Sequence, residues 1–215
     1  MKPTLKTELL PLLMVVISIA LGVYFYSVFP EQVPIHWNVY GEVDNWGSKL
    51  TGAIMGPAMV IGIYLLFLII PLIDPRKEKY SEFSKPFNVF KILLMLLMLG
   101  IYLIASLSSL GYNLRVEVWI PSLIGVMFVL MGNYMGKIKP NWFMGIRTPW
   151  TLSNDEVWNK THRLGGKMFV VLGLYLLLSP LLPPQYTFLA MLILVIGMVI
   201  VSTVYSYVLY KKLKK

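Results

Sequence analysis

The sequence predicts an all-α membrane protein: a polytopic bundle of six transmembrane helices with both termini in the cytoplasm. Three observations lead to this prediction, namely the composition, six long apolar segments and the distribution of basic residues. Hydrophobic residues make up 57% of the 215 positions and charged residues only 13%, about half the share found in ordinary soluble proteins. Such a composition is typical of a chain that lives in a lipid bilayer.

Six apolar segments are each long enough to cross the hydrocarbon core, which takes about 20 helical residues. They lie at 9–29, 51–73, 90–111, 118–136, 167–183 and 187–209. The first follows Lys2 and Lys6, as the apolar part of a signal peptide would. Because no small-residue cleavage site follows it, we predict an uncleaved first helix.

The loops between these segments indicate the orientation. Seventeen of the 19 Lys and Arg residues fall in the N-terminus, the 74–91 loop, the 137–167 loop and the C-terminus. In a six-span arrangement all four regions lie on one face, and the other face carries only Lys49 and Arg115. The positive-inside rule therefore places both termini in the cytoplasm. The six tryptophans agree, because all of them lie in loops or at segment ends, where aromatic belts form.

Several function classes are excluded or disfavoured by what is missing. The absence of cysteine excludes disulfides, thiolate metal sites and a cysteine nucleophile. The two histidines, His36 and His162, are too few for a His-rich metal site. None of the common nucleotide-binding or hydrolase motifs occurs. We therefore expect no enzyme activity, no cofactor, no bound metal and no direct nucleic-acid binding, and we attribute the net charge of +9 to cytoplasmic retention of basic residues.

No Asp, Glu, Lys, Arg or His lies within a predicted apolar core, whereas ion-coupled pumps usually need such a group on their pathway. The polar residues within them are mild, and hydroxyl groups of this kind most often pack helices together. Asn133, near the cytoplasmic end of the fourth segment, could instead anchor the loop that follows.

The extracytoplasmic loop at 29–50 is longer than a connection requires. Its apolar residues alternate with polar ones from Val33 to Val39, which predicts an extended strand, and turns are predicted at Tyr40-Gly41 and at 44–47. We expect a compact lid over the bundle. His36 with Glu31, Glu42 and Asp44 could hold a divalent cation, although a structured loop with its polar groups in water is the simpler interpretation.

The cytoplasmic loop at 137–167 is the second informative segment. Ser153 followed by Glu156 fits a capping box, which predicts a basic amphipathic helix over 154–164 that ends at Gly165-Gly166 and lies on the membrane surface. Arg147, between two tryptophans, suits a carboxylate, a phosphate or helix-end carbonyls. It either ties the loop to the bundle or contacts a ligand or partner.

The long loops follow the first and the fourth spans, so we predict one membrane domain built from two three-helix halves. The N-terminal half covers 1–110 with the outer loop, and the C-terminal half covers 111–215 with the cytoplasmic loop. Each loop carries an acidic-aromatic run, at 43–46 and at 155–158, which would fit an inverted repeat.

Two runs of residues make the chain recognisable. The outer run PIHWN at 34–38, with Gly41, Asp44 and Trp46, resembles the uncharacterised N-terminal module often joined to SdpI-type proteins. The inner run GIRTPWT at 145–151, with EVW at 156–158, His162-Arg163 and Lys167, resembles the SdpI family of integral membrane immunity proteins. The resemblance covers essentially the whole chain.

This resemblance implies a six-span, multi-pass plasma membrane protein that binds a secreted, membrane-active peptide toxin. It further implies toxin resistance and signal transduction, in which a small winged-helix autorepressor is held at the membrane. The alternatives are a transporter or flippase of small amphiphiles and a membrane-embedded hydrolase. We expect two functional surfaces. The inner one comprises Asn133, Arg147, Thr148, Trp150, Trp158, His162 and Arg163, and the outer one comprises His36, Trp37, Asn38, Gly41 and Asp44.

Overall fold

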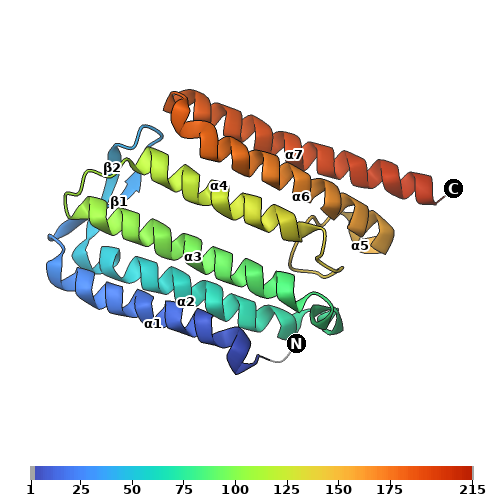
Figure 1. Cartoon of the computed structure of the whole chain (residues 1–215), viewed down its shortest axis with the longest axis horizontal. Helices are drawn as coiled ribbons and strands as arrows, with labels where there is room; N and C mark the ends of the chain where they lie inside the picture. The colour runs from blue at the N-terminus through green and yellow to red at the C-terminus, as the bar shows by residue number, and fades with distance from the viewer. Residues whose placement is uncertain (1–2, 215) are drawn as a thin grey trace.

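The structure is a computed structural model that describes residues 3–214, and it consists of long helices with one small sheet (Figure 1). The long helices are α1 (Leu5–Val28), α2 (Lys49–Ile73), α3 (Ser84–Ser109), α4 (Val116–Met135), α6 (Asp155–Leu178) and α7 (Pro184–Leu213). The short elements are β1 (Gln32–Trp37), β2 (Val43–Ser48), α5 (Pro149–Ser153) and the 3-10 turns η1 (Lys77–Ser81) and η2 (Ser179–Leu181).

The prediction of a six-span helical bundle is confirmed. Six helices are long and apolar enough to cross a membrane. Both ends of the described chain lie at the end of the bundle that carries η1 and α5, and the hairpin lies at the opposite end (Figure 1). The basic loops thus share one side, which the positive-inside rule assigns to the cytoplasm.

The long helices lie roughly side by side. Helices α1, α2 and α3 pack against one another, and α3 also packs against α4. The most extensive contact of α4 is with α6. Helix α7 packs on α6 at the edge of the bundle and touches α5 (Figure 1). The largest apolar core lies at the cytoplasmic end, where Tyr80, Phe83 and Phe87 meet Ile138 and Trp158.

The cytoplasmic amphipathic helix differs from its prediction at both ends. Its N-cap is Asn154, whose side chain accepts from the backbone N–H groups of Glu156 and Val157, because Ser153 is already the last residue of α5. The helix continues through Gly165-Gly166 to Leu178 as a single span, α6. These glycines do not end the helix: both are buried, Gly166 against the α4 backbone at Gly132 and Gly165 against Ile146 of the cytoplasmic loop, and a larger side chain would not fit at either place.

The outer loop is a β-hairpin, as the alternation predicted for its first strand. The turn at Tyr40-Gly41 is confirmed, with Gly41 at a φ of 79° that favours glycine. The predicted turn at 44–47 is wrong, because these residues form β2 and pair antiparallel with β1. Val33 anchors the hairpin by packing with Phe25 and Phe29 among the buried residues of α1, α2 and α3.

The helices also contain a charged pair that was assigned to the loops. Helix α1 begins before the predicted residue 9 and therefore contains Glu8, and Lys91, at the junction of the predicted loop and third segment, lies two turns inside α3; the two form a buried ion pair. The Lys91 Nζ lies 2.9 and 2.8 Å from the two carboxylate oxygens of Glu8. This pair joins two helices at the cytoplasmic end of the bundle.

Candidate functional site

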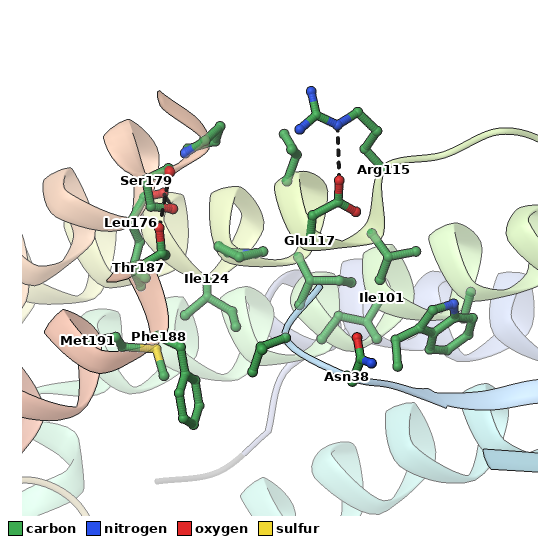
Figure 2. A pocket seen from close by; sticks show the side chains of 18 of the residues that line it. Asn38, Ile101, Arg115, Glu117, Ile124, Leu176, Ser179, Thr187, Phe188 and Met191 are labelled. Atoms are coloured by element: carbon green, nitrogen blue, oxygen red, sulfur yellow. Dashed lines mark hydrogen bonds and ion pairs between the residues drawn. The ribbon is translucent and has the colours of Figure 1, made fainter. Parts of the chain in front are cut away.

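A cavity of about 410 Å³ lies beneath the outer hairpin. Side chains from α3, α4, α6 and α7 converge on it, and Asn38 reaches it from the end of β1 (Figure 2). Its walls are mostly apolar, with Ile101 on α3, Ile124 on α4 and Phe188 and Met191 on α7. An apolar cavity with a few polar groups is the usual form of a ligand site.

The rim of this cavity is polar and charged. The Arg115 Nε donates to Glu117 at 3.0 Å, and Glu117 in turn lies directly beneath Gly41, where any Cβ would collide with its carboxylate. The positive φ of Gly41 favours glycine here, and any other residue would also push the Glu117 carboxylate aside. The contact places the hairpin turn against the first turn of α4, so the hairpin forms the roof of the cavity.

The outer candidate residues take two kinds of position. His36, Trp37 and Asn38 line the cavity, whereas Gly41 and Asp44 support the roof. Asp44 pairs with His36 through a 2.5 Å contact to its Nδ1. The side chain of Asn38 donates to Glu42. Among the described residues, no group of three or more acidic or histidine side chains is placed to hold a metal ion.

At the cytoplasmic end, Asp74 joins the two loops that follow α2 and α4. One of its carboxylate oxygens accepts from the Tyr80 hydroxyl at 2.7 Å and from the backbone N–H of Trp142 at 3.0 Å. Burial of Tyr80 and its hydrogen bond to Asp74 raise the pKa of the phenol well above its usual range. The phenol therefore remains a donor, and Asp74 is a position that the sequence interpretation missed.

Two of the inner candidate residues lie in the interior of the protein. Trp158 and His162 are fully buried on α6, with their rings stacked 4.0 Å apart. The backbone N–H of Ile146 donates to His162 Nε2 at 3.0 Å, so Nδ1 carries the proton and donates to the Trp158 carbonyl. The indole of Trp158 donates to the Ile138 carbonyl. Both side chains therefore hold the cytoplasmic loop against α6.

Two more inner candidates attach the loop to α7. The Thr148 hydroxyl lies 3.0 Å from that of Ser206, and the Trp150 ring packs 5.0 Å from that of Tyr207. Thr148 also caps α5, where it forms a capping box with Thr151. The capping box predicted for Ser153 and Glu156 is wrong, because Asn154 is the N-cap of α6.

The remaining inner candidates, Arg147, Arg163 and Asn133, are exposed. The guanidinium of Arg147 donates to the Trp142 carbonyl at 2.6 Å, so it does tie the loop together. Asn133 donates to the Val129 carbonyl of its own helix instead of anchoring the following loop. Of the inner candidates, Arg147 and Arg163 are thus exposed charged side chains, and Trp142 and Phe143, whose rings are half-exposed, lie in the same cytoplasmic loop.

Comparisons with known proteins agree with the resemblance in the two loops. Residues 137–206 match the SdpI/YfhL protein family, and residues 13–61 match a domain of unknown function, DUF1648. The Immunity protein SdpI of Bacillus subtilis (strain 168) is 31% identical over 209 residues, which cover 97% of this chain and 98% of that protein. No solved structure matches the chain. With its six apolar helices, this chain is a multi-pass plasma membrane protein that belongs to the SdpI/YfhL family.

Proposed function

We propose that this protein is an immunity protein that protects the cell making it against a membrane-active peptide, which it binds in the outer cavity. The whole-length similarity to a protein named for immunity supports the role. The single observation that carries the binding site is the cavity beneath the hairpin, which His36, Trp37 and Asn38 line. Binding alone would suffice for protection, so the proposal includes no catalytic step.

The depth of the cavity suits such a ligand. Its α4 wall runs from Val116 to Ile124, which corresponds to about 12 Å along a helix that rises about 1.5 Å per residue. The site therefore extends from the outer interface into the outer half of the hydrocarbon core, which is about 30 Å thick. A peptide that partitions into the outer leaflet would meet apolar walls and a polar rim at matching depths.

Filling the cavity is expected to abolish protection. Ala105 lines the cavity from α3, and Ala105→Phe would place a phenyl ring where the ligand binds. We expect survival of a sensitive host, challenged with the toxic peptide of a related immunity system, to fall by at least tenfold at unchanged membrane abundance. The matched control is Ala58→Phe, because Ala58 is exposed on α2 and lines none of this cavity. Full protection by Ala105→Phe would rule out the cavity as the binding site.

The cytoplasmic face is where we propose that a winged-helix autorepressor is held. Arg147 and Arg163 with Trp142 and Phe143 offer exposed cationic and aromatic side chains, which are the residue types enriched in protein interfaces. The loop that presents them rests on α6 and α7 through Thr148 and Trp150. Both helices also line the outer cavity, so a ligand there could bias the loop.

Truncating Arg147 is expected to weaken this second function while the protein remains in the membrane. Arg147→Ala removes an exposed charge and one hydrogen bond to the Trp142 carbonyl. We expect the amount of winged-helix repressor recovered with the membrane fraction after toxin challenge to fall several-fold. Lys85→Ala, an exposed charge at the start of α3, serves as the control. A parallel loss of protein abundance would instead make Arg147 a structural residue.

A further inference from the structure

A second groove opens between the outer halves of α1 and α2, away from the cavity described above. It has a volume of about 310 Å³ and is lined by Gly22, Val23 and Tyr26 of α1 and by Leu50, Ile54 and Pro57 of α2. Val23, Tyr26, Leu50 and Ile54 are all at least half exposed in the protein alone. Side chains at this depth face the bilayer, so the groove faces lipid.

Within this groove α1 and α2 approach each other closely at Gly22. A Cβ on Gly22 would lie only 2.8 Å from Pro57 Cγ and 3.0 Å from the Ala53 carbonyl oxygen. The two helices therefore touch at this point, and the side chains around it leave an apolar slot. From Leu50 to Pro57 the slot runs about 10 Å along α2, at about 1.5 Å per residue.

One basic side chain, Lys49, lies at the extracytoplasmic end of this slot. Lys49 is the first residue of α2, and its Nζ lies 5.3 Å from the centroid of the Tyr26 ring, which lines the groove. Arg115, the other basic residue of the outer face, is already paired with Glu117. Within residues 3–214, Lys49 has no carboxylate within ion-pair distance. A cation above an apolar slot matches the charge and shape of an anionic lipid.

We propose that this groove binds one anionic phospholipid of the outer leaflet, with an acyl chain in the slot and the phosphate at Lys49. The headgroup level is where Lys and Tyr side chains interact best with lipids. The acyl chain would fill the slot that the side chains of α1 and α2 leave empty. The ion pair between Lys49 and the lipid phosphate would favour a headgroup with a net negative charge. This site is independent of the toxin site, since the two cavities share no residue.

Native mass spectrometry of the purified full chain tests the site. We expect phosphatidylglycerol to bind about fivefold more tightly than phosphatidylcholine with the same acyl chains, the effect of one lysine near an anionic headgroup. Lys49→Gln should abolish this difference, and Lys49→Arg should retain it. Lys85→Gln, which removes an exposed charge from the cytoplasmic side, should leave it unchanged.

A second variant tests the slot itself. Ile54→Trp fills the groove from a half-exposed position, so it should weaken the binding of both lipids while Lys49 remains. Equal binding of the two lipids to the native chain would overturn the proposal. So would displacement of phosphatidylglycerol by millimolar inorganic phosphate, which would indicate a simple anion site. A dimer that Ile54→Trp dissociates would overturn it as well, because a second copy would then occupy the groove.

Discussion

Replacing Lys91 by methionine is expected to lower the free energy of unfolding by about 3–5 kcal/mol, the usual cost of leaving one member of a buried ion pair without its partner. The side chains of Lys91 and Glu8 are only 1% and 9% exposed. Both carboxylate oxygens of Glu8 accept from the Lys91 ammonium. Without it, Glu8 would keep the Thr7 hydroxyl as a side-chain donor but would lose the cation that balances its charge.

The measurement is the thermal unfolding of the purified protein in detergent, with membrane abundance as a second readout. The double variant Glu8→Met/Lys91→Met should recover most of the loss, because replacing both charges by apolar side chains of similar size is often close to neutral. Lys85→Met is the control, since Lys85 is exposed on the same helix. A double variant as unstable as the single one would mean that packing, and not the charge, makes Lys91 important.

The sequence predicted the six spans well because the bilayer imposes a simple requirement. Every spanning segment must be apolar over about 20 residues and helical, and the basic loops then select the orientation. The helix ends were harder to predict. Glu8 and Lys91 look like loop charges in the sequence, and only the packing of α1 on α3 makes them a buried pair. A charge next to an apolar segment does not reveal whether it faces water or a partner.

The outer part of the candidate site could be found from the sequence, but its cavity could not. The alternation from Val33 to Val39 indicated a strand, and three residues within it do line the cavity. The walls, however, come from four helices far apart in the chain. Residues such as Ile124 and Phe188 are indistinguishable in sequence from lipid-facing ones, so only the tertiary arrangement identifies them.

At the inner face, residue type was a weaker guide than periodicity. Trp158 and His162 attracted a functional interpretation because tryptophan and histidine are frequent in sites. They stand four residues apart on the stripe of α6 that continues into Gly165 and Gly166, and the whole stripe is buried. Helical spacing into an apolar span was thus a signal for the interior. The sequence around Asp74 shows only a lone acid at the end of an apolar segment. Its partner Trp142 lies 68 residues away, so their contact could not be predicted from sequence spacing.

Replacing Gly166 by valine is expected to produce the second large loss of stability, and its cause lies in the contact between α4 and α6. A Cβ on Gly166 would lie 2.6 Å from the Gly132 carbonyl oxygen, and a Cβ on Gly132 would lie 2.6 Å from the Gly166 oxygen. About two turns further along α6, a Cβ on Gly173 would likewise lie 2.6 Å from the Gly125 carbonyl oxygen. Small residues of this kind let membrane helices approach closely.

Because the obstructing atoms belong to the backbone, no side chain can move aside, and the two helices must separate. We expect a cost at the upper end of the range of about 1–3 kcal/mol that is typical of overpacked interiors. The separation would also shift Leu176 away from Ile124 across the outer cavity and displace His162 beneath the cytoplasmic loop. Toxin protection and repressor recovery should therefore fall together with the melting temperature.

Gly197→Val is the matched control for this prediction. Gly197 also lies inside a membrane helix, α7, yet a Cβ there would meet no atom within 4 Å. The same change of side chain should therefore leave the melting temperature and protection nearly unchanged. If the two valine variants melted at the same temperature, the close approach of α4 and α6 would not be what holds the bundle together, and the stability of the C-terminal helices would have to come from the loop contacts at Trp158 and His162 instead.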